Sequence, residues 1–108
     1  MRAEPARLAG SALLALCAGA AMASPDAERR EALIHLLRHD CGSCHGMTLN
    51  GGLGPPLTAP ALEGKTEASL EATILHGRPG TPMPPWRGLL SDDEVHWLVH
   101  ALKSGDVE

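Results

Sequence analysis

The feature that most constrains this chain is the run Cys41-Gly42-Ser43-Cys44-His45. On a helical turn, side chains three and four positions apart share one face, so both thiols and the imidazole point the same way. This C-x-x-C-H pattern is the attachment signature of a c-type haem. The thiols can bind the two vinyl groups of the macrocycle while the imidazole meets the iron. The sequence therefore predicts one covalently attached haem c, with Cys41 and Cys44 as thioethers and His45 as an axial iron ligand.

Two other kinds of site also use closely spaced cysteines. A thiol-disulfide redox site, which Cys-Gly-Ser-Cys resembles, needs a strand-helix-strand context, and the sequence has no strand-like alternation of useful length. A structural zinc site usually takes four ligands in tetrahedral geometry, but a second cysteine pair is absent and the other histidines are scattered. The pattern therefore favours haem over both.

The first 23 residues have the pattern of a secretory signal peptide. Arg2 and Arg7 precede an apolar run at about 8–21, and the segment ends in the small-residue pattern Ala-Met-Ala. We predict cleavage after Ala23, which gives a signal peptide over 1–23 and a haem domain over 24–108 in the periplasm.

Two alternative uses of this segment are membrane attachment by a helix or by a lipid. The apolar run is shorter than the roughly 20 residues that a spanning helix needs. A lipidated Cys17 would follow a small residue, whereas Leu16 stands there. We therefore expect no stable membrane anchor.

The domain that remains is acidic and poor in aromatic residues. Removal of Arg2, Arg7 and Glu4 from 9 basic and 13 acidic residues leaves 7 and 12, a net charge of −5, which argues against nucleic acid as a partner. The chain has no Phe or Tyr and only two Trp. A domain this small with mainly aliphatic side chains lacks material for a core, and a buried macrocycle would supply it.

Three segments have helical signals, and none has those of a strand. The first, Ser24–Arg38, has Ser24 as a candidate N-cap, Pro25 at the first helical position and an apolar stripe of Leu33, Leu36 and Leu37. The second is expected to begin after the cap Thr66 and to end near His76. The sequence therefore predicts an all-α fold.

The third helix has the strongest signals. Residues 91–94, Ser-Asp-Asp-Glu, form a capping box. Apolar residues follow at helical spacing, and Gly105 marks the end. Those apolar residues are Val95, Leu98, Val99 and Leu102.

Glycine and proline define two long loops between these helices. Residues 46–63 contain four glycines and three prolines, a content that predicts an ordered loop without regular helix. Residues 77–86, Gly-Arg-Pro-Gly-Thr-Pro-Met-Pro-Pro-Trp, must also be irregular, and they display Met83. Long loops in small domains are usually functional.

A second axial ligand would decide between an electron carrier and a haem with an open site. Of the methionines left after signal cleavage, Met47 is too close to His45 to reach the opposite face of the ring, so Met83 is our candidate. Pro82 and Pro84 stiffen its loop. His76 is the rival, and bis-histidine ligation would lower the redox potential relative to Met/His.

The other histidines form two pairs spaced by four residues. His96 and His100 lie off the apolar stripe of the last helix, so we expect them to be exposed, with an adventitious metal site as the alternative. His35 and His39 have the same spacing and the same expectation.

Three further residues are candidate haem contacts. A carbonyl in the Gly54–Leu57 turn, Gly-Pro-Pro-Leu, would accept the Nδ1 hydrogen of His45, and Leu57 would pack on the porphyrin. Trp86 either donates its indole N–H to a haem propionate or simply packs.

The order of these motifs resembles class I cytochromes c. Cys-Gly-Ser-Cys-His, Gly-Pro-Pro-Leu, Thr-Pro-Met-Pro-Pro and a helix capped by Ser-Asp-Asp-Glu follow one another as in that family, over nearly all of residues 26–104. The resemblance implies three to four helices and long loops around one haem, with the first and last helices crossed. It also implies His45 and Met83 as axial ligands and Pro55 as the carbonyl that supports His45.

The stretch Ile-Leu-His-Gly-Arg-Pro-Gly-Thr-Pro-Met-Pro-Pro-Trp resembles a narrower group. These are the small periplasmic cytochromes encoded with the haem c and haem d nitrite reductase of denitrifying bacteria. The resemblance implies electron delivery to that nitrite reductase in denitrification, or a role in maturing its haem d. Because an iron with two protein ligands has no open site for substrate, we expect a one-electron carrier and not an enzyme, and we expect it to be a monomer. The cytochrome c maturation machinery would attach its haem.

Two other functions stay open at this point. One is an accessory role in haem d biosynthesis or in maturation of the reductase, and the other is gas sensing through a weak or absent methionine ligand. The sequence also departs from many class I relatives, which have an aromatic residue where Ala101 precedes Leu102. Trp97, one turn earlier, is our candidate to fill that space.

Overall fold

The computed structural model describes residues 2–3, 5, 10–12 and 23–108. The predicted signal peptide lies mostly outside these residues. In the described part every regular element is helical, which confirms the all-α fold. The elements are α1 (Ala27–Leu36), the π-helical turn η1 (Leu37–Cys41), α2 (Gly42–His45), α3 (Ala59–Leu62), α4 (Glu67–His76) and α5 (Asp92–Ser104).

The first three elements form one continuous helical run from Ala27 to His45. It begins two residues later than expected: Asp26, not Ser24, is the N-cap, and its carboxylate accepts the backbone N–H of Arg29 at 2.8 Å. An aspartate caps as well as a serine and adds a negative charge at the positive end of the helix dipole. Near the other end, the N–H of Gly42 bonds to the carbonyl of Leu37, the wider spacing of a π turn.

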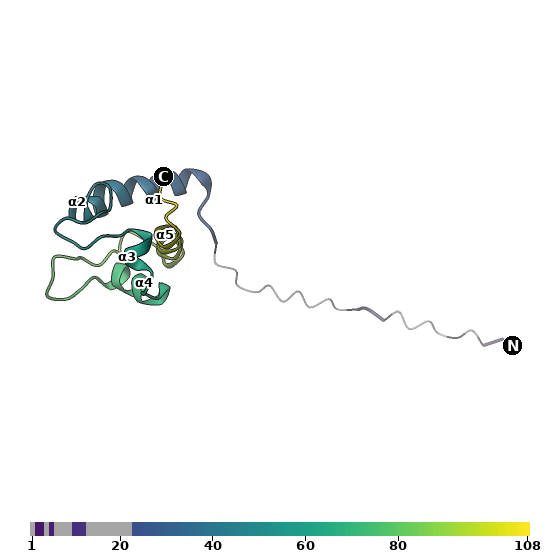
Figure 1. The fold of residues 1–108 in the computed structure, drawn as a ribbon. Helices are drawn as coiled ribbons and strands as arrows, with labels where there is room; N and C mark the ends of the chain where they lie inside the picture. The colour runs from purple at the N-terminus through teal and green to yellow at the C-terminus, as the bar shows by residue number, and fades with distance from the viewer. Residues whose placement is uncertain (1, 4, 6–9, 13–22) are drawn as a thin grey trace.

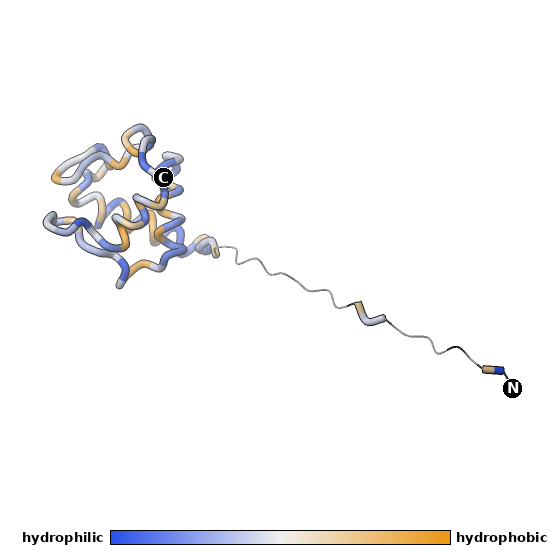
Figure 2. The backbone as a smooth tube through the Cα atoms, turned by 90° about the horizontal axis from the view of Figure 1, so that it is seen from below, coloured by the Kyte–Doolittle hydropathy of each residue, from blue (hydrophilic) through white to orange (hydrophobic). Residues whose placement is uncertain are grey.

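The core lies where α1 and α5 cross (Figure 1). Its most buried side chains come from these two helices and from η1: Leu33, Leu37, Val95, Leu98 and Val99. Hydrophobic and hydrophilic residues alternate along the helical segments (Figure 2). Helices α1, α3, α4 and α5 each contribute at least one buried apolar side chain to the core.

The space beside Ala101 is packed without an aromatic residue at that position. Ala101 is buried, and Trp97 is partly buried against the core. Both residues therefore contribute to the packing of α5.

The long loop after α2 is not wholly irregular. Residues 59–62 form the short helix α3, with a proline in its first turn and Leu62 in the core. We expected no helix in 46–63, and that expectation is wrong. Proline is tolerated in the first turn of a helix because the amide there has no intrahelical acceptor to lose.

Helices α4 and α5 begin where the sequence predicts. Thr66 accepts the N–H of Ser69 at 3.1 Å at the start of α4. At the start of α5, Glu94 N–H donates to Ser91 Oγ at 3.2 Å and Ser91 N–H donates to Glu94 Oε1 at 3.0 Å. Gly105 then ends α5 in the left-handed conformation.

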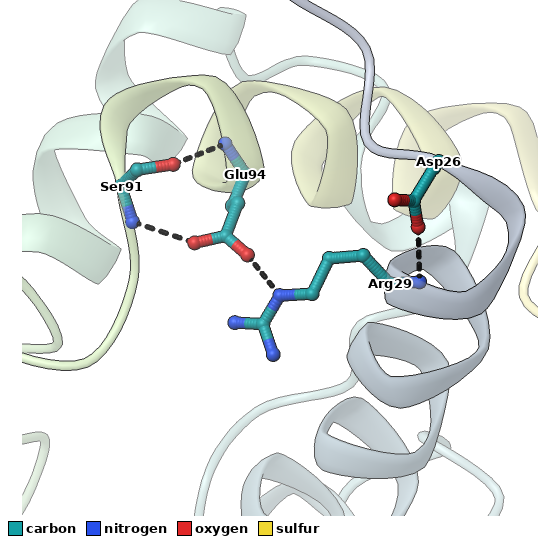
Figure 3. A network of polar contacts seen from close by, with 4 residues as sticks. All are labelled: Asp26, Arg29, Ser91 and Glu94. Carbon is teal, nitrogen blue, oxygen red and sulfur yellow. Dashed lines mark hydrogen bonds and ion pairs between the residues drawn. The ribbon is translucent and has the colours of Figure 1, made fainter.

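Glu94 also links the two crossing helices through an ion pair with Arg29 (Figure 3). This hydrogen bond, together with the N–H of Ser91, holds the pKa of Glu94 below its ordinary value of 4.5. A carboxyl whose pKa is lower in the folded state stabilises the fold above its unfolded pKa, and this contribution disappears as the pH falls through the folded pKa.

We predict that Glu94→Gln lowers the unfolding midpoint at neutral pH and that the difference from wild type vanishes in acid. Ser91→Ala, which removes an uncharged cap worth about 1 kcal/mol, should destabilise at both pH values. Denaturant unfolding of the holoprotein at pH 7 and pH 3 measures both. A Glu94→Gln deficit of equal size at pH 3 would contradict the charge argument.

Candidate functional site

A cavity of about 730 Å³ lies between α2 and the two long loops. In Figure 1 both loops lie on the same side of the molecule as α2. The volume is in the range of cofactor pockets, about 300–1,000 Å³. Its lining includes every residue that the sequence analysis names for the haem site: Cys41, Cys44, His45, Pro55, Leu57, Met83 and Trp86.

The imidazole of His45 is oriented by the loop that follows it. Nδ1 of His45 lies 2.7 Å from the carbonyl oxygen of Pro55, the contact expected from the sequence. A carbonyl only accepts, so Nδ1 carries the proton and donates. In the neutral ring this tautomer leaves the lone pair on Nε2, the state that a metal ligand requires, and the acceptor raises its basicity.

Gly54 is a site residue that the sequence analysis missed. A Cβ at this position would lie 2.8 Å from both Cε1 and Nδ1 of the His45 ring. Any other residue would push the imidazole away from its place, so the ring packs directly on backbone. The Gly-Pro-Pro-Leu motif was the available signal, since glycine allows a close approach that no other residue does.

The two cysteines differ in their surroundings. Cys41 is half-buried and Cys44 is exposed. Burial, with smaller contributions from Asp40 and Cys44, raises the pKa of Cys41 to about 11. Before attachment the Cys41 thiol is thus neutral at physiological pH and packs as a small apolar group.

The loop that carries Met83 is fastened at several points. Arg78 N–H donates to the Met83 carbonyl at 3.2 Å, and Met83 N–H donates to Thr81 Oγ1 at 3.3 Å. The loop returns to α4 where Trp86 N–H donates to the Ile74 carbonyl at 2.9 Å. With Pro82 and Pro84 on either side, Met83 is held in a stiff segment.

Gly77 allows that loop to fold back on the end of α4. Its φ is +68°, and a Cβ there would lie 2.7 Å from the Met83 carbonyl oxygen and 2.8 Å from Pro85 N. From the sequence, Gly77 is only the first residue of the irregular segment after the second helix. Its second role depends on a contact six residues away, which no local pattern signals.

The rival ligands are not part of the cavity. His76 is exposed at the end of α4, and Met47 is 59% exposed; neither lines the cavity. His96, expected to be exposed, is half-buried because it packs against Glu71 with Nδ1 2.6 Å from Oε1. His100 is exposed, as expected.

The residues that line the cavity suit a c-type haem. It contains two thiols at the C-x-x-C spacing, an imidazole whose Nε2 lone pair is free, and a thioether on a separate stiff loop. Residues 25–100 match the family described as "Cytochrome C oxidase, cbb3-type, subunit III". The chain belongs to this family of cytochrome c domains, and it is a monohaem c-type cytochrome with covalently attached haem c.

Relatives in two bacteria share one name, cytochrome c55X. This chain is 60% identical over 89 residues to cytochrome c55X of Pseudomonas aeruginosa, covering 82% of this chain and 75% of that protein. It is 51% identical over 97 residues to cytochrome c55X of Paracoccus denitrificans, covering 89% and 94%.

Two solved structures are similar to this one. The c-type cytochrome NirC is 61% identical, with a TM-score of 0.75 over 77% of this chain and 98% of that one. Dihydro-heme d1 dehydrogenase NirN in complex with DHE is 39% identical, with a TM-score of 0.60 over 64% of this chain but 15% of that one. In the described part of this chain, no helix is long and apolar enough to cross a membrane.

We predict that Gly77→Ala destabilises the protein more than Gly80→Ala does. Both glycines have positive φ, +68° and +79°, but a Cβ at Gly80 meets nothing within 4 Å. Gly80→Ala should therefore cost only the backbone strain, about 1–2 kcal/mol. Gly77→Ala adds the clash with the Met83 segment and the cost of a conformation, φ +68° with ψ −171°, that essentially only glycine adopts.

Denaturant unfolding of both holoproteins measures this difference. Equal destabilisation by the two substitutions would show that the clash at Gly77 is relieved at no cost and would refute its role in placing the loop.

Proposed function

We propose that this protein is a one-electron carrier of the periplasm that donates electrons to nitrite reductase in denitrification and is not itself an enzyme. The observation that carries the proposal is that His45 and Met83, from separate elements, line one cavity. With both axial positions occupied by protein ligands, the iron has no position for a substrate.

In this proposal Cys41 and Cys44 hold the haem covalently, and His45 and Met83 bind its iron. Pro55 supports His45 through its carbonyl, Leu57 packs on the ring, and Trp86 contacts the haem. The haem iron supplies reversible one-electron exchange between its ferric and ferrous states.

The chain itself contributes a stiff loop around Met83 and a hydrogen-bond acceptor for the His45 ring. Pro82 and Pro84 hold Met83 in place, and the Pro55 carbonyl holds the His45 ring. Both ligands therefore keep their positions in either oxidation state, which favours fast electron transfer. A thioether opposite an imidazole gives a higher potential than two histidines.

An exposed apolar side chain beside the cavity supports the docking of a transient redox partner. Leu53 lines the cavity, yet it is 83% exposed. A partner that docks there would cover apolar surface next to the haem. Such a contact stays small in a carrier that must dissociate between turnovers, and we propose that the carrier is a monomer.

The compartment rests on the predicted signal peptide. We propose that residues 1–23 direct export and are removed after Ala23, and that the maturation machinery attaches the haem to the exported chain. Mass spectrometry of the mature holoprotein tests the cleavage position.

We predict that Met83→Ala abolishes the Fe–S absorption band at the red end of the ferric spectrum, because the iron loses its thioether ligand. Met47→Ala is the matched control, since Met47 is 59% exposed and does not line the cavity. Ferric spectra of both variants measure the band. An unchanged band in Met83→Ala would refute the assignment and leave gas sensing or another ligand to be considered.

We predict that the reduced protein is oxidised by nitrite reductase on the timescale of turnover. Stopped-flow mixing with the reductase, followed at the haem absorption of the carrier, measures the rate. Absence of oxidation on that timescale would refute the carrier proposal.

A second candidate is electron exchange during haem d biosynthesis, with this protein as acceptor. It is favoured by the 39% identity to a segment of a dihydro-heme d1 dehydrogenase. Mixing the oxidised protein with that dehydrogenase and its substrate separates the candidates. Reduction there, without oxidation by nitrite reductase, would assign the protein to biosynthesis.

A further inference from the structure

Four side chains from α4 and α5 gather on the surface away from the haem cavity. Glu67 and Glu71 lie four residues apart on α4, and His96 and His100 lie four residues apart on α5. Residues at this spacing share a helix face. None of the four lines the cavity.

The distances bring these pairs together across the helix interface. One ligand atom each of Glu67, Glu71 and His96 lie within 4.8 Å of one another. His96 Nδ1 is 2.6 Å from Glu71 Oε1, and His100 Nδ1 is 4.0 Å from Glu67 Oε1. Glu67, Glu71 and His96 could therefore share one ion, and His100, beside Glu67, would complete the set as a fourth ligand.

The donor chemistry selects a class of ion. Two neutral imidazoles and two carboxylates balance the charge of a dication, and nitrogen with oxygen in fourfold coordination suits Zn²⁺ and related transition metals better than Ca²⁺ or Mg²⁺. The side chains of Glu71 and His96 are 25% and 39% exposed, and those of Glu67 and His100 are 46% and 71% exposed, so the site lies at the surface and is open to solution.

A second histidine pair on the same protein lacks these partners. His35 and His39 are also four residues apart, and their ring centroids lie 4.2 Å apart. No carboxylate within 4.0 Å of either ring is found among the described residues, whereas His96 and His100 each have one. Histidine spacing is thus shared by the two pairs, and the facing carboxylates distinguish them.

We propose that Glu67, Glu71, His96 and His100 form a site for a divalent transition metal, with Zn²⁺ as the ion, that joins α4 to α5. Because α4 leads into the loop of Met83, an ion here would stabilise the helix pair on which that loop is built. The site is independent of the haem and of the proposed electron transfer.

Zinc titration of the ferric holoprotein by calorimetry tests the proposal, with Glu71→Gln, His96→Gln and the control His35→Ala/His39→Ala. We expect one Zn²⁺ per protein, and at least about tenfold weaker binding in each of the two site variants. The control should bind as wild type does. The haem absorption spectrum of each variant shows whether it is folded.

A second measurement locates the ion without a substitution. In the reduced, diamagnetic holoprotein, Zn²⁺ should shift the imidazole nitrogen resonances of His96 and His100 and leave those of His35 and His39 unchanged. Zinc should also raise Tm in proportion to the logarithm of its concentration above Kd.

Three results would overturn the proposal. They are the absence of saturable zinc binding by wild type, undiminished binding in both site variants, and loss of binding in the His35→Ala/His39→Ala control.

Discussion

The structure depends on the way in which backbone from the first loop closes around the His45 ring. The Pro55 carbonyl accepts its Nδ1 hydrogen, and Gly54 presents a bare Cα to the ring. The same loop satisfies the end of the helical run, because Gly51 N–H donates to the His45 carbonyl at 2.8 Å and Gly54 N–H to the Cys44 carbonyl at 2.7 Å. Carbonyls that a helix end leaves without partners thus hold the loop, and the loop in turn holds the ligand.

The segment that carries Met83, on the other side of the cavity, depends on α4. A chain segment rich in proline has few amides with which to form its own structure. The segment after Gly77 is instead tied to α4, through Trp86 and Ile74, and α4 is packed on α5. The crossing of α1 and α5, with the Arg29–Glu94 ion pair at its edge, is therefore the frame that carries both loops.

The same arrangement of helices leaves room for both the haem cavity and the proposed metal site in one small domain. The aliphatic side chains of the interior leave a large apolar cavity, which a macrocycle fills, so the core and the cofactor site are one region. The polar face of the α4–α5 pair points elsewhere and gathers Glu67, Glu71 and the two histidines of α5. The proposed metal would contact residues that neither the core nor the haem requires.

The sequence by itself determined what depends on local spacing. Cys41, Cys44 and His45 lie within one helical turn, and Ser91 to Glu94 form a cap within four residues, so both could be read from the chain alone. Met83 followed from the exclusion of Met47, and the contact of His45 with Pro55 followed from motif order and from the family resemblance. These inferences needed no knowledge of distant contacts.

The tertiary structure alone decided features that depend on atoms far apart in the chain. Gly54 and Gly77 appeared in the sequence as turn residues, and only the packed ring of His45 and the returning Met83 segment show why a Cβ has no room there. The N-cap of α1 is Asp26, whereas the sequence predicted Ser24. Several nearby residues can cap a helix, and local pattern does not rank them. The partial burial of His96 required α4 to bring Glu71 beside α5, a contact across 25 residues that helical periodicity cannot express.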